Sequence, residues 1–70
     1  MPNTTQALEH EATVVGWSRG HAHANYVDAY GGDMDEEPVV PQHYASVPTY
    51  FAAGWAEGVQ DYRDEASDCE

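Results

Sequence analysis

The second half of the chain carries the clearest helical period in the sequence. Phe51, Trp55, Val59 and Tyr62 recur at spacings of four, four and three, which places them on one face of a helix. A proline precedes them in the position where a helix start best tolerates it. We therefore expect a helix over about residues 48–66, with this face packed against another element.

Carboxylates follow the same helical spacing on another side of this predicted helix. Side chains three or four residues apart on a helix lie about 5–6 Å apart at Cβ. A row of negative charge is therefore predicted from Glu57, Asp61, Asp64, Glu65 and Asp68. Its spacing is comparable with that of nucleic-acid phosphates, which lie about 3.4 Å apart along the axis of one duplex strand. The other interpretation is a solvated helix face that is acidic for solubility.

The N-terminal half predicts another helix, over about residues 5–30. An apolar stripe at i, i+3 and i+4 comprises Leu8, Ala12, Val15, Ala22, Tyr26 and Ala29. The Gly31-Gly32 pair is a typical end for such a helix. Gly16 and Gly20 each cost about 1 kcal/mol relative to alanine inside a helix, so a break between them is the alternative.

Both predicted helices contain the pattern Gly-Trp-x-x-Gly, at residues 16–20 and 54–58. Three matched positions are few enough to arise by chance. The physical alternative is that small residues at i and i+4 let two helix backbones approach closely, with Trp17 and Trp55 beside the contact. On the first helix the ridge of small residues is Ala12, Gly16, Gly20 and Ala24. This predicts a helix pair, or a homodimer built from two such pairs.

The segment between the helices is acidic and contains prolines. Its carboxylates are Asp33, Asp35, Glu36 and Glu37. The prolines that follow favour extended or turn conformations, so we expect an irregular connection with a short strand at 39–40 or a helical turn near 42–45. A connection this long in a compact domain usually has a functional role or contains an unrecognised element.

Charge is the property that most limits function. The 70 residues include 13 acidic and two basic side chains, for a formal net charge of −11, and charging all four histidines changes it only to −7 (−11 + 4). Such a chain is repelled by nucleic acid and anionic membranes and attracted to basic surfaces. No stretch reaches the roughly 20 apolar residues of a membrane span, and the first residues lack an export signal. We therefore expect a cytoplasmic protein with a basic protein partner, and no direct contact with nucleic acid or membrane.

Catalytic and metal-binding motifs are lacking in the sequence. His21 and His23 would point about 200° apart on a helix, so they cannot share one ion. Residues 33–37 resemble the start of a calcium loop, but Pro38 stands where that loop needs glycine. A chain this short has little interior in which to raise the pKa of a general acid, and its five tyrosines are better explained as core and interface aromatics. We expect no enzyme activity, no cofactor and no metal.

Together these patterns predict a mostly helical single domain whose two helices are joined by an irregular acidic segment. The leading functional hypothesis is a small inhibitor whose carboxylates occupy a basic nucleic-acid-binding surface of a partner protein. Phage-encoded inhibitors of bacterial defence, such as anti-CRISPR and anti-restriction proteins, offer an analogy of size and charge alone. The predicted contact residues are Glu57, Asp61, Asp64, Glu65 and Asp68 on the helix and Asp33, Asp35, Glu36 and Glu37 before it. The predicted aromatic anchors or core residues are Trp17, Tyr50, Phe51, Trp55 and Tyr62.

Two alternatives come from other functional classes. A structural or assembly protein adapted to high salt would also be acidic and poor in lysine. Such a protein should unfold as salt is removed, whereas an electrostatic inhibitor should stay folded and lose its partner as salt rises. The other alternative is an acidic adaptor whose aromatic patch binds a partner helix, with charge serving only solubility.

Overall fold

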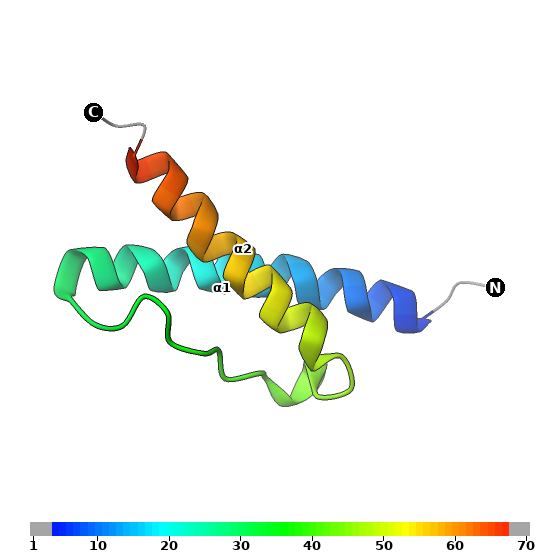
Figure 1. The fold of residues 1–70 in the computed structure, drawn as a ribbon. Helices are drawn as coiled ribbons and strands as arrows, with labels where there is room; N and C mark the ends of the chain where they lie inside the picture. The colour runs from blue at the N-terminus through cyan, green and yellow to red at the C-terminus, as the bar shows by residue number, and fades with distance from the viewer. Residues whose placement is uncertain (1–3, 68–70) are drawn as a thin grey trace.

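The computed structural model describes residues 4–67, and two long helices account for most of them (Figure 1). Helix α1 spans Thr4–Tyr30, the short 3-10 helix η1 spans Gln42–Tyr44, and helix α2 spans Pro48–Ser67. The mostly helical fold and both helix positions predicted from the sequence are confirmed. Among residues 4–67 there is no strand, so the helical turn, and not a strand, lies in the connection.

Helix α1 continues without a break through Gly16 and Gly20 and ends at the predicted glycine pair. Gly31 and Gly32 have φ angles of 91° and 138°, a region that residues with a Cβ seldom adopt. The amide of Gly31 donates to the carbonyl oxygen of Val27 at 2.7 Å, which satisfies one of the last carbonyls of the helix. Glycine at this point therefore ends α1 and lets the chain turn back.

The two helices cross as an X and run in the same overall direction (Figure 1). Along the chain, Gly16 meets Phe51 and Gly20 meets Trp55, so the contact advances in the same sense on both helices. A parallel pair requires the connection to return from the end of α1 to the level of its first half. Extended chain covers up to about 3.3–3.6 Å per residue, so residues 31–47 are long enough for this return. The length of the connection thus follows from the direction of the helices.

Four glycines allow the helix backbones to approach closely at the crossing. They are Gly16 and Gly20 of α1 and Gly54 and Gly58 of α2. A Cβ placed on any of them would lie 2.1–2.3 Å from a carbonyl oxygen of the other helix, whereas real Cβ contacts are essentially never shorter than 3.0 Å. The small-residue contact is therefore made within one chain. A homodimer built from two such pairs stays a prediction.

The crossing has an approximate two-fold symmetry that follows the 38-residue offset between the two Gly-Trp-x-x-Gly patterns. Gly16 lies against the carbonyl oxygen of Phe51, and its counterpart Gly54 lies against that of Thr13, the counterpart of Phe51. The other two glycines lie in the same way against the carbonyl oxygens of the two tryptophans. The repeated pattern therefore has a physical role: both copies make the same contact.

The hydrophobic core lies beside the first half of α1. Phe51 is fully buried and shares a cluster with Ala12, Tyr44 and Val47. The rings of Tyr44 and Phe51 stack with centroids 5.8 Å apart, and the Tyr44 hydroxyl donates to Glu11 Oε2 at 2.8 Å. Helix η1 thus closes this end of the core by placing Tyr44 over Phe51.

The buried side of α1 differs from the predicted apolar stripe in the second half of the helix. Ala12 and Ala24 are fully buried, whereas Ala22 and Ala29 are exposed and Tyr26 is 60% exposed. The prediction was wrong there because α2 contacts the ridge of small residues and not the larger apolar side chains. Close contact between helix backbones requires small residues, whereas the predicted stripe was identified from hydrophobicity alone.

The crossed helices leave much of the chain accessible. The molecule measures 48 × 22 × 13 Å and exposes 4978 Å². A compact chain of 7.7 kDa would expose about 4300 Å². The core is therefore small and much of the surface stays exposed, as expected for a chain of this length.

Candidate functional site

The four described members of the predicted carboxylate row share one side of α2. Glu57, Asp61, Asp64 and Glu65 lie within about 100° of the helix circumference, at about 100° per residue. Three of them are exposed and Asp61 is half-buried. Asp68 lies outside the described residues. We refer to Glu57, Asp61, Asp64 and Glu65 as the acidic row.

Helix α1 holds two carboxylates of the acidic row. The indole Nε1–H of Trp17 donates a short hydrogen bond to Asp61 Oδ2. His21 Nε2 lies 3.0 Å from Glu65 Oε2, and the rings of Trp17 and His21 stack with centroids 5.1 Å apart. A hydrogen bond to a carboxylate leaves its charge in place and restricts its orientation. Two of the four carboxylates therefore have fixed positions.

A shallow apolar depression adjoins the acidic row. It is lined by Thr13, Val14 and Trp17 of α1 and by Glu57 of α2. Val14 is 52% exposed, so its apolar side chain is accessible beside Glu57. An apolar wall beside a carboxylate suits the aliphatic stem and charged end of lysine or arginine.

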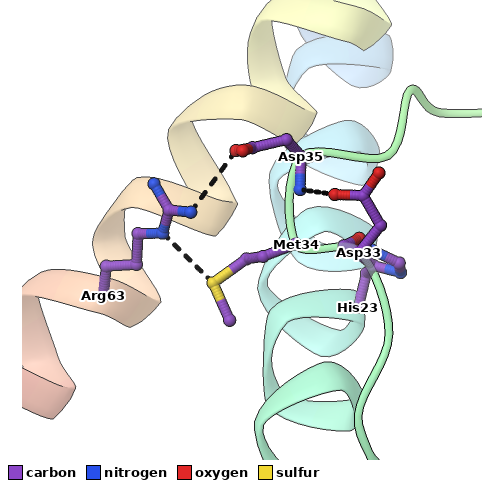
Figure 2. A network of polar contacts seen from close by, with 5 residues as sticks. All are labelled: His23, Asp33, Met34, Asp35 and Arg63. Carbon is purple, nitrogen blue, oxygen red and sulfur yellow. Dashed lines mark hydrogen bonds and ion pairs between the residues drawn. The ribbon is translucent and has the colours of Figure 1, made fainter.

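The acidic segment at residues 33–37 packs against α2 through one arginine (Figure 2). Arg63 Nη2 donates to Asp35 Oδ1 at 3.3 Å, and its Nε–H donates to Met34 Sδ at 3.1 Å. The Asp35 amide donates to Asp33 Oδ1 at 2.9 Å, and His23 Nε2 lies 2.9 Å from the Asp33 carbonyl oxygen. One of the two basic side chains of the protein thus holds the segment in place.

The two groups of predicted contact carboxylates face different directions. Arg63, which binds the segment, lies about 200° around α2 from Asp61 in the acidic row, at about 100° per residue. Asp35, Glu36 and Glu37 are exposed beside Arg63. A partner that covers the acidic row would therefore meet the 33–37 segment only by reaching around α2.

The aromatic residues predicted as anchors or core residues differ in how deeply they are buried. Phe51 is fully buried, Trp17, Trp55 and Tyr62 are half-buried, and Tyr50 is 44% exposed. The Tyr62 hydroxyl donates to Asp28 Oδ2 of α1 at 2.6 Å. Of these five, Phe51 alone belongs to the buried core, and the half-buried rings lie along the sides of the crossing.

The other tyrosines divide between core and surface. Tyr44 is buried against Phe51, as described above. Tyr26 and Tyr30, near the end of α1, are 60% and 79% exposed, and their rings lie 5.0 Å apart. A spacing of four residues on a helix makes these two rings neighbours. They are exposed because α2 packs against the glycine ridge on another side of α1.

Two of the tyrosine hydroxyls that bind carboxylates of α1, those of Tyr44 and Tyr50, have a raised pKa. The hydrogen bond to Glu11 raises the pKa of Tyr44 above its usual value of 10.0, and desolvation adds to the effect. The hydrogen bond to Glu9 likewise raises the pKa of Tyr50. Both effects favour the neutral phenol as donor to an ionised carboxylate. These bonds join the first half of α1 to η1 and to the start of α2.

The histidines do not assemble a metal site in the described part of the chain. His21 faces Glu65, whereas His23 faces the Asp33 carbonyl and its ring lies tilted against that of Trp55, with centroids 5.0 Å apart. Within residues 4–67, no three histidine, cysteine or carboxylate side chains gather closely enough to hold an ion.

Neither of the described long helices combines the length and the apolar character of a membrane span. Comparison with protein-family models, with curated proteins and with solved structures found no match to this chain.

Proposed function

We propose that this chain is a protein-binding inhibitor that places the acidic row against a basic nucleic-acid-binding surface of a partner protein. The observation that carries the proposal is the fixed row itself: Trp17 and His21 hold Asp61 and Glu65 on an accessible side of α2. Carboxylates that are already ordered lose less conformational entropy on binding. The formal net charge of −11 adds long-range attraction to a basic surface and repulsion from nucleic acid.

The length of the row supports nucleic-acid mimicry. From Glu57 to Glu65 the helix rises by about 12 Å, at about 1.5 Å per residue. One strand of duplex DNA carries about three to four phosphates over that distance, at about 3.4 Å each. Four carboxylates over the same length present a similar charge density to a basic groove. In this proposal the inhibitor acts in the cytoplasm, and the analogy with phage-encoded anti-defence proteins rests on size and charge.

The test compares two double variants that change the net charge equally. Glu57→Gln with Asp64→Asn removes two charges from the acidic row, and Ser18→Lys with Asn25→Lys adds two positive charges to the side of α1 that faces away from α2. Both variants have a formal net charge of −9 (−11 + 2). All four positions are exposed, so the fold should be preserved. The chain is immobilised, and proteins are captured from cells that encode it at about 0.1 M salt.

The captured protein is then purified and tested for release of labelled DNA or RNA when the chain is added. We expect the affinity of the row variant for the captured protein to be at least about tenfold lower, because each charged contact is worth about 1 kcal/mol or more. The control variant should lose much less affinity. Equal losses in the two variants would show that only net charge matters. A captured protein that keeps its nucleic acid in the presence of the chain would contradict inhibition.

A second candidate function, a salt-adapted structural or assembly protein, is favoured by the placement of the remaining acids. Glu9, Glu11 and Asp28 lie on α1, outside the acidic row and the 33–37 segment, and Asp28 binds Tyr62 beside the row. Acids distributed over the whole surface are what salt adaptation requires, whereas recognition requires them only at the contact. The dependence of folding on salt, described in the Discussion, separates the two candidates.

A further inference from the structure

A pocket of about 340 Å³ lies between the acidic segment and α2, on the opposite side of the crossing from the acidic row. Trp55, Ala56 and Val59 form an apolar floor. Arg63 also lines it, together with the exposed carboxylates of Glu36 and Glu37, which we call its rim. The pocket thus combines an aromatic and aliphatic surface with carboxylates, outside the site described above.

The negative charges at the rim favour a cationic ligand. Both rim carboxylates are exposed, and the Glu36 carboxylate lies 3.9 Å from His23 Nε2. An anionic ligand would meet repulsion from them, because the cation at the pocket, Arg63, is already paired with Asp35 at 3.3 Å. That pair also shows that a guanidinium fits against this segment. Arginine combines an aliphatic stem, which packs on apolar surface, with a planar charged end that stacks on aromatic rings and binds carboxylates in a fixed geometry.

We propose that this pocket binds an arginine side chain of the partner protein. The aliphatic stem of that arginine lies on Trp55 and Ala56, and its guanidinium lies at the carboxylates of Glu36 and Glu37. The inference rests on the proposed function in one respect, since it assumes a partner with a basic surface. It assigns a separate, shape-selective contact to the side of α2 that the acidic row does not cover. The arginine pocket would make binding depend on one basic residue as well as on total charge.

The probe is a blocked tripeptide, acetyl-Ala-Arg-Ala-amide, added at up to about 10 mM, the concentration range that suits a contact made by one side chain. The two indole N–H signals of the protein report the site by NMR. We expect the Trp55 signal to shift and saturate and the Trp17 signal to stay in place. A tripeptide with citrulline in place of arginine keeps the shape without the charge and should not bind. A lysine tripeptide should bind more weakly, and free guanidinium ion more weakly still.

Matched variants test whether the shift of the Trp55 signal comes from binding in the pocket. Ala56→Phe fills the pocket and should abolish the shift, whereas Ala53→Phe makes the same change at an exposed position of α2 outside the pocket lining and should keep it. Glu36→Gln with Glu37→Gln should weaken binding at least fivefold. Far-UV circular dichroism checks that each variant remains helical.

Several outcomes would overturn the inference. The inference fails if the Trp55 signal does not shift at about 10 mM peptide. It also fails if both tryptophan signals shift equally, or if the Trp55 shift persists in Ala56→Phe. The pocket and the proposed function can fail separately. If the captured partner still binds Ala56→Phe fully but loses the Glu57→Gln, Asp64→Asn variant, the function stands and the pocket fails. If the peptide binds as expected but the captured protein has no affinity for nucleic acid, the pocket stands and the proposed function fails.

Discussion

Gly54→Ala should destabilise the protein, although alanine is the better helix former. The added Cβ would lie 2.1 Å from the carbonyl oxygen of Thr13, 2.9 Å from its carbonyl carbon and 3.0 Å from its Cα. All three are backbone atoms of α1, so no side-chain rotation can relieve the overlap. The helices must separate by about 0.9 Å (3.0 − 2.1) before even the shortest real Cβ contact is reached.

The cost follows from that separation. A gap of about 0.5–1 Å removes a quarter to a half of the dispersion energy of the contacting atoms. Overpacking typically costs about 1–3 kcal/mol, and more where neither side can yield. The gain in helix propensity from glycine to alanine offsets about 1 kcal/mol. We expect a net loss of about 2 kcal/mol, which for a domain of this size lowers Tm by about 8–16 °C.

Thermal and urea unfolding followed by far-UV circular dichroism would measure this loss. Gly31→Ala is the matched control, because its φ of 91° strains a side chain but nothing lies within 4 Å of the added Cβ. It should cost only about 1 kcal/mol. Gly16→Ala with Gly54→Ala should cost less than the sum of the single changes, since the first separation makes room for the second Cβ. A Gly54→Ala protein that melts at or above the native Tm would refute close backbone contact at the crossing.

Three further predictions concern the bonds between segments and the surface charge. Trp17→Phe keeps a ring but removes the donor to Asp61, and it should lower the free energy of unfolding in urea by about 1–2 kcal/mol; an unchanged value would show that this bond does not contribute. Because the pKa of Tyr44 is raised, the folded state keeps that proton longer than the unfolded state, so this stabilisation is complete below pH 10 and declines above it. Tyr44→Phe should therefore show a smaller fall in stability than the native chain as the pH rises above 10, and an equal fall would contradict the assignment. Lowering salt from about 1 M to 0.1 M lengthens the screening distance from about 3 to 10 Å, and an inhibitor should stay folded over this range, whereas unfolding would favour salt adaptation.

The sequence predicted the helices well because each has a local signal at one of its ends. Gly31 and Gly32 marked the end of α1, and the proline at position 48 marked the start of α2. The period of Phe51, Trp55 and Val59 identified the face of α2 that packs. The relative direction of the helices was not predictable from these signals, because periodicity identifies a face and carries no information on parallel or antiparallel pairing. The long connection, which the sequence indicated was a functional segment or an unrecognised element, is explained in the structure by the parallel pairing of the helices.

The candidate site was predictable in its spacing but not in its contacts. Helical geometry placed Glu57, Asp61 and Glu65 on one side of α2, as the structure shows. The partners of the last two, Trp17 and His21, are 44 residues away in the sequence, and no local pattern relates them. The same holds for the Asp35–Arg63 pair, which required knowing that the connection returns along α2. Long-range polar contacts depend on topology, and topology was the part that the sequence left open.

The repeated Gly-Trp-x-x-Gly pattern produces equivalent positions that the rest of the chain makes different. Trp17 with Val14 and Trp55 with Ala52 are counterparts at the 38-residue offset, and each pair lines a depression beside the crossing. The returning segment covers the Trp55 side and supplies its carboxylates, whereas the Trp17 side stays open beside Glu57. A near-symmetric helix pair thus presents two unlike acidic surfaces. Under the proposed function, a single asymmetric basic surface would therefore fit the protein better than a partner with two-fold symmetry.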